Sequence, residues 1–218
     1  MPVKKTFLNL PEERQKEILD IAIMEFTLND YKNASLSNII KKIGLAKGSF
    51  YRYFNSKKDL YIYLIEYSMQ SRFEEIEDLS RSDITMEEIL IQNYRNKIRY
   101  DQQYPLYSGF GYRIFREIDN EEVSEIITGL RDKVLLYTKA ILEHQVGKGD
   151  VKAGSDLDAI AYMIYQNQVG FFEYLSFKFG INYLKNIEEG KPIYSVPEEQ
   201  IIQSLESFVE ILIHGIKK

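Results

Sequence analysis

The chain of 218 residues carries 28 lysines and arginines against 33 acidic residues, and it contains two histidines and no cysteine. This length allows one large domain or two small ones, and either can bury a hydrophobic core. The lack of cysteine excludes disulfide scaffolds, thiolate zinc sites and cysteine nucleophiles. Neither a signal peptide nor a membrane span is recognisable in the sequence, so we expect a cytoplasmic protein.

The net charge of −5 is distributed unevenly along the chain. Residues 1–58 carry 11 lysines and arginines against 6 acids, whereas residues 59–218 carry 17 against 27. A basic segment joined to an acidic remainder is typical of a protein that meets a polyanion such as DNA at one end. A solvated charged surface would produce the same imbalance, so charge alone leaves both interpretations open.

Helix start and stop signals begin near the N-terminus. The segment Asn9-Leu-Pro-Glu12 predicts the start of a helix that continues to about Leu28. Ser35 is a candidate N-cap for a short helix, and Gly44 ends it. A second short helix is predicted over residues 47–54, and a long helix begins near residue 56.

The remaining signals are helical too. Thr85-Met-Glu-Glu88 and Asp119-Asn-Glu-Glu122 both resemble capping boxes, and further helices are expected after residues 155 and 195. Pro105 and the glycines that follow it predict a break between the two capping boxes. Because no alternating strand pattern appears, we expect an all-α fold of about nine helices.

The two short helices over residues 35–54 form a candidate helix-turn-helix. At about 100° per residue, Phe50 and Phe54 point toward the preceding helix, and Gly48 and Arg52 point away from it. A surface made of glycine and polar groups suits a helix in the major groove, because glycine permits close approach. The pair could also be a plain packing unit.

Charge and hydroxyl groups around this segment favour DNA binding. Ser49, Tyr51 and Tyr53 flank the outward face, where hydroxyl groups can bond to phosphates. Lys57 and Lys58 lie in the first turn of the next helix, where cations oppose the helix dipole unless an anion neutralises them.

The string Ile43-Gly-Leu-Ala-Lys-Gly-Ser-Phe-Tyr-Arg-Tyr-Phe-Asn-Ser-Lys57, followed by Asp59 and Leu60, resembles the DNA-binding segment of TetR-type (tetracycline-repressor-like) transcriptional regulators. The resemblance covers about residues 8–65. It implies a helix-turn-helix domain over residues 1–68 and a ligand-binding and dimerisation domain over residues 69–218. Ala46 stands where the family often has a capping serine.

The resemblance also implies which residues contact DNA. Lys47, Gly48 and Ser49 would form the base-reading end of the recognition helix. Phosphate contacts are implied for Ser35, Tyr51, Tyr53 and Lys57, and Ser37 could reach DNA. Arg52 occupies a variable family position, so its assignment depends on the helical geometry described above.

The two long helices expected after residues 155 and 195 are apolar on more than one side. Burial of one face inside the subunit and of the other against a partner would explain this pattern. Burial of the whole helix inside one subunit would explain it too. In the family these helices pair with those of a second copy, so we expect a homodimer.

Aromatic residues dominate the acidic part of the chain. Together they would suit a cavity for a flat, apolar or cationic effector, although a tyrosine stripe at helical spacing is common in hydrophobic cores. Glu117 and its acidic neighbours are expected to lie on solvated helix faces. The candidate ligand-binding residues are Tyr94, Tyr104, Tyr107, Phe110, Tyr162, Tyr165 and Gln166.

The sequence thus favours a ligand-responsive repressor that binds a (pseudo)palindromic operator as a homodimer. A DNA-binding regulator whose C-terminal domain docks another protein, and binds no small ligand, is the alternative. The sequence contains no phosphate loop, nucleophile–base spacing or metal-ligand set, so neither an enzyme nor a cofactor or metal site is expected.

Overall fold

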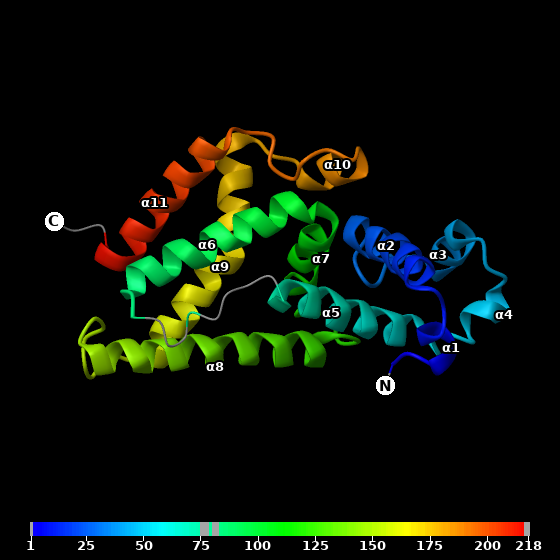
Figure 1. Ribbon diagram of the computed structural model, residues 1–218, viewed down its shortest axis with the longest axis horizontal. Helices are drawn as coiled ribbons and strands as arrows, with labels where there is room; N and C mark the ends of the chain where they lie inside the picture. Colours follow the sequence, from blue (N-terminus) through cyan, green and yellow to red (C-terminus); the bar gives the residue numbers. More distant parts are fainter. Residues whose placement is uncertain (1, 75–78, 80–82, 216–218) are drawn as a thin grey trace. The chain divides into compact units, whose positions relative to one another are not determined.

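The computed structural model describes residues 2–74, 79 and 83–215, and the regular structure in these ranges is α-helical (Figure 1). An isolated antiparallel bridge joins Val3 to Phe54. The described helices number eleven rather than the expected nine or so. They are α1 (Lys5–Leu8), α2 (Glu12–Leu28), α3 (Leu36–Ile43), α4 (Lys47–Phe50), α5 (Lys57–Glu74), α6 (Met86–Gln103), α7 (Pro105–Phe115), α8 (Ser124–Lys148), α9 (Leu157–Phe179), α10 (Tyr183–Glu188) and α11 (Glu198–His214).

The helices group into two compact units. The first contains α1 to α5 together with α7, most of α10 and the start of α8, and the second contains α6, most of α8, α9 and α11. The boundary predicted between residues 68 and 69 falls inside α5. A division of function at this boundary remains a prediction.

Aromatic side chains fill the core of the first unit. Phe26 of α2 lies with its ring centroid 4.9 Å from that of Tyr61 of α5, and Tyr31 lies 5.0 Å from Tyr61. The ring of Tyr61 also meets Phe110 of α7 edge to face at 5.6 Å. Because all four rings are buried, they hold α2, α5 and α7 together behind the helix-turn-helix.

The predicted break lies at Tyr104, between α6 and α7, and does not extend into the glycine-containing segment, because α7 runs through it. Proline is compatible with the first turn of a helix, where its missing N–H has no partner to lose. Gly109 is buried at a close approach between helices. An added Cβ would lie 2.3 Å from Cδ1 of Ile187 and 3.0 Å from Cγ2 of Thr27. Tertiary packing therefore requires glycine at this position, although its low helix propensity predicts the end of a helix.

Helix capping confirms one of the two predicted capping boxes. Thr85 Oγ1 accepts the Glu88 N–H at 3.2 Å, and Glu88 Oε2 accepts the Thr85 N–H at 2.8 Å. The box predicted at Asp119 is wrong, since α8 begins only at Ser124. Hydrogen-bonded turns occupy the intervening residues, as the Asn120 N–H donates to the Glu117 carbonyl at 3.0 Å.

The second unit has its own aromatic core. The ring of Tyr94 on α6 packs 4.7 Å from Phe171 of α9 and 6.1 Å from Phe208 of α11. A buried ion pair lies on the same helix α6, where the Lys97 ammonium is 3.1 Å from the Asp101 carboxylate. Tyr194 donates its hydroxyl hydrogen to the same carboxylate at 2.5 Å. No helix in the described part of the chain has the length and hydrophobicity of a membrane span.

Candidate nucleic-acid interface

Helix α3 is fixed at both ends by the residues that the sequence predicts. Ser35 Oγ accepts the Asn38 N–H at 3.2 Å, which satisfies one of the unpaired donors of the first turn. Gly44 ends the helix with φ of 74°, a left-handed conformation that glycine adopts without a Cβ penalty. Its buried face, Ile39, Ile40 and Ile43, packs toward the interior of the first unit.

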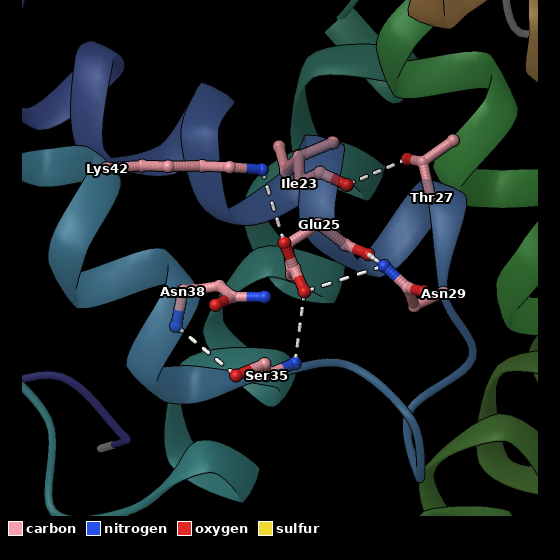
Figure 2. A network of polar contacts seen from close by, with 7 residues as sticks. All are labelled: Ile23, Glu25, Thr27, Asn29, Ser35, Asn38 and Lys42. Carbon is pink, nitrogen blue, oxygen red and sulfur yellow. Dashed lines mark hydrogen bonds and ion pairs between the residues drawn. The ribbon is translucent and has the colours of Figure 1, made fainter.

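A buried carboxylate attaches the start of α3 to α2 (Figure 2). Glu25 Oε1 accepts the Ser35 N–H at 3.1 Å, and Lys42 Nζ lies 3.3 Å from Oε2. The Glu25 side chain is 5% exposed, whereas that of Lys42 is 53% exposed. Asn29 Nδ2 bonds to the Glu25 carbonyl at 3.2 Å. Sequence patterns did not predict that Glu25 would bond to the start of α3. The available signal was an acidic residue directly beside the buried Phe26.

Helix α4 is shorter than the predicted helix over residues 47–54. Regular α-helix ends at Phe50, and hydrogen-bonded turns continue to Tyr53. Phe50 and Phe54 are buried, as the helical geometry predicts. Ala46 supplies no side-chain cap. An added Cβ at the exposed Gly48 would meet nothing within 4 Å.

The predicted DNA-contacting residues differ in their exposure. Most of the helix α4 segment presents its side chains to solvent. Five of them are exposed: Ser37 of α3, Lys47, Gly48, Tyr51 and Arg52. The other four are partly buried: Ser35, Ser49, Tyr53 and Lys57. The Ser35 hydroxyl accepts the capping bond and keeps its own hydrogen available for a phosphate oxygen.

Lys57 has structural partners of its own. Its Nζ donates to the Tyr31 carbonyl at 2.6 Å and to the Ala34 carbonyl at 3.3 Å. The ammonium also lies 4.6 Å from the centroid of the Tyr31 ring, a cation–π distance. Lys57 therefore holds the loop between α2 and α3, and its contact with phosphate remains a prediction. The neighbouring Lys58 is exposed.

Glu117 is buried rather than solvated, which corrects the sequence-based expectation. Its two carboxylate oxygens accept the Tyr31 N–H at 2.9 and 3.0 Å. Burial raises the pKa of Glu117, and the hydrogen bond from Tyr31 partly opposes that rise. Arg113 Nε donates to the Thr27 carbonyl at 3.2 Å. Residues at and just after the end of α7 thus bond to the last turn of α2 and to the loop between α2 and α3.

The predicted ligand-binding residues belong to both compact units. Tyr104, Tyr107 and Phe110 belong to the first unit, where the Tyr107 hydroxyl donates to Asp20 at 2.6 Å. In the second unit, Gln166 Nε2 donates to the exposed Tyr162 hydroxyl at 2.8 Å. Tyr94 and Tyr165 are buried there. Two surface pockets, of about 630 and 380 Å³, are lined by other residues.

A capped helix, a glycine turn and a short exposed helix over a buried aromatic pair define a helix-turn-helix protein of the DNA-binding class. Residues 18–64 match the family model described as bacterial regulatory proteins, tetR family. The match assigns this helix-turn-helix segment to the DNA-binding domain of the tetR family of bacterial regulatory proteins.

Bacterial regulators are similar to the chain over most of its length. The fatty acid metabolism regulator protein of Bacillus subtilis strain 168 is 25% identical over 152 residues, which cover 68% of this chain and 76% of that protein. A TetR family transcriptional regulator from Chloroflexus aurantiacus superposes with a TM-score of 0.75 at 25% identity, covering all of both chains. FadR from Bacillus subtilis, solved in complex with stearoyl-CoA, superposes with a TM-score of 0.63 at 22% identity, covering 93% of this chain and 99% of that one.

Proposed function

We propose that the protein is a cytoplasmic, homodimeric repressor that binds a (pseudo)palindromic operator and leaves it when a small effector binds. The observation that carries the proposal is the exposed face of α4 around Gly48, with Phe50 and Phe54 buried behind it. A backbone that lacks a Cβ at an exposed position can approach base edges closely. Two such helices in a dimer would enter successive major grooves about 34–36 Å apart.

The DNA contacts are proposed in two groups. Four residues of α4 and its following turn would face the bases: the exposed Lys47, Gly48 and Arg52, and the partly exposed Ser49. The remaining residues would bond to phosphates and fix the register of the protein on the duplex. They are Ser35, Ser37, Tyr51, Tyr53 and Lys57.

Exposed apolar side chains support a homodimer through α9 and α11. Phe177 of α9 is 89% exposed, and Met163 on the same helix is 56% exposed. On α11, Ile211 is 55% exposed. Each large apolar side chain that leaves water on association contributes about 1.5–3 kcal/mol. A second copy that covers these side chains would explain their position on the surface.

The second unit supplies the effector site in this proposal. The Tyr94 hydroxyl is buried and has no hydrogen-bond partner among the described residues. A bound molecule could satisfy it, and the surrounding Phe171 and Phe208 would contact the molecule's apolar part. The stearoyl-CoA in the FadR structure makes an acyl-CoA the first candidate. An aromatic or cationic compound is the second.

The test begins with a duplex that the protein itself selects from a random-sequence pool. Fluorescence anisotropy should show release of this duplex by stearoyl-CoA but not by free coenzyme A. Tetraphenylphosphonium tests the second effector class in the same assay. If neither compound releases the duplex and a protein partner does, the docking alternative is correct. Sedimentation of Phe177→Asp should show monomers where the unsubstituted protein forms dimers.

A further inference from the structure

The recognition helix α4 has few stabilising hydrogen bonds within itself. Helix α4 comprises four residues, and Ala46 before it makes no side-chain capping bond. A single turn forms few internal hydrogen bonds, so most of its stability must come from other parts of the chain. The carbonyl groups of Tyr51, Arg52 and Tyr53 follow directly after this turn.

Residues 3–7 supply partners for all three of these carbonyls. Lys4 Nζ donates to the Tyr51 carbonyl at 2.7 Å, and the Thr6 hydroxyl donates to the Arg52 carbonyl. The Lys4 backbone N–H donates to the Tyr53 carbonyl at 2.9 Å. The lysine charge also lies at the carbonyl end of the short helix, where a cation is favourable.

Phe7 anchors this segment in the core. Its side chain is fully buried, and its ring lies 5.1 Å from Phe54 and 5.8 Å from Tyr53. The ring of Tyr63 on α5 meets it at 5.7 Å. The backbone hydrogen bond from Lys4 to Tyr53 is part of the antiparallel bridge between Val3 and Phe54. The burial of Phe7 thus attaches the segment to the fold independently of the hydrogen bonds that it makes to the turn.

We propose that residues 3–7 form a brace that positions the recognition helix and the phosphate-binding tyrosines for DNA. The proposal rests on the DNA contacts assigned above, because its effect is measured through them. It concerns residues outside the 18–64 segment that matches the family model. A brace differs from a charged arm that touches DNA directly: Thr6 carries no charge, and the Lys4 ammonium bonds to a carbonyl of the protein.

The first test uses Thr6→Val, which removes one hydroxyl from an exposed residue and leaves the charge unchanged. The probes are the duplex selected by the wild type and a shuffled duplex of equal composition. Loss of the hydrogen bond should weaken binding to the selected duplex by about fivefold, with binding to the shuffled duplex unchanged. Thr6→Ser keeps the donor and should restore the wild-type preference.

The second test compares Lys4→Met with Lys5→Met. The two substitutions each remove one positive charge, and the two residues are adjacent. Of these two side chains, the structure records a hydrogen bond to the turn that follows α4 for Lys4 only. A brace predicts that Lys4→Met lowers the preference for the selected duplex and that Lys5→Met does not. A charged arm predicts equal weakening in both variants. The slope of log affinity against log salt concentration would then become shallower by about 0.9 for each phosphate that is no longer neutralised, and this result would overturn the proposal.

Hydrogen exchange separates the brace from the proposed function. In DNA-free protein, the amides of residues 51–54 should exchange about fivefold faster in Thr6→Val than in the wild type, since the turn opens more often. Unchanged exchange together with unchanged binding would overturn the brace. A wild type that does not prefer its selected duplex would overturn the proposed function, and the exchange result would still decide the brace.

Discussion

Replacing Glu25 with alanine should destabilise the first unit more than its single surface ion pair suggests. The substitution removes the acceptor of the Ser35 N–H at the start of α3 and the partner of Lys42 (Figure 2). A hydrogen bond to a charged group contributes about 1.5–3 kcal/mol. An ion pair with a half-exposed lysine contributes about 0–1 kcal/mol. Together they give an expected loss of about 1.5–4 kcal/mol.

Two control variants separate these contributions. Glu25→Gln keeps an oxygen acceptor for Ser35 and loses the charge, so it should cost about 1–2 kcal/mol. Lys42→Met removes only the exposed partner and should cost less than about 1 kcal/mol. Urea unfolding of the full chain, followed by far-ultraviolet circular dichroism, measures all three free energies. The order Ala, then Gln, then Met, from largest loss to smallest, follows from the geometry.

A loss below about 0.5 kcal/mol for Glu25→Ala would contradict this explanation, because surface substitutions without structural partners fall in that range. A loss in Lys42→Met as large as that in Glu25→Ala would also contradict it. In that case the ion pair, rather than the hydrogen bond to the start of α3, would carry the stability.

Three further predictions concern the same unit. Lys57→Met should lower the free energy of unfolding by about 1–2 kcal/mol because its carbonyl partners are left without a donor, whereas Lys58→Met should weaken DNA binding without lowering the midpoint of thermal unfolding. Gly109→Ala should lower stability by about 1–3 kcal/mol because of overpacking, and Ile187→Val should reduce that loss in a double-mutant cycle. Burial raises the folded-state pKa of Glu117. The protonated side chain therefore contributes stability that is fully present below the ordinary pKa of 4.5 and is lost as the pH rises through the raised pKa. In urea titrations across pH, the free energy of unfolding of Glu117→Gln should vary less with pH than that of the wild type.

The parts of the fold that the sequence predicts are those that local chemistry determines. Ser35 and Gly44 mark the ends of α3 because capping and left-handed turns depend on single residue types. Helical periodicity is sufficient to place Phe50 and Phe54 inside. Helices α1 and α10 were not predicted because four and six residues are too few to show a period.

The remaining features depend on contacts between distant segments. Helix α7 tolerates Gly109 because Ile187 and Thr27 approach it there, and no local pattern reveals such an approach. Glu117 and Lys57 bond to backbone groups of Tyr31, which nearly every residue type offers equally. Sequence patterns therefore carry no signal for these partners, and both side chains were expected to lie in other environments.

The proposed function requires that the exposed face of α4 enters the major groove of DNA. Gly48→Ala tests this requirement at the residue where the proposal brings the backbone close to the bases. An added Cβ meets nothing within 4 Å in the free protein, and alanine favours helix over glycine by about 0.8–1.0 kcal/mol. The measurement is fluorescence anisotropy with the selected and shuffled duplexes, alongside the thermal unfolding midpoint. We predict an unchanged or higher midpoint and a decrease of about tenfold in affinity for the selected duplex, equivalent to about 1.4 kcal/mol. Wild-type affinity and preference in this variant would show that α4 does not enter the groove.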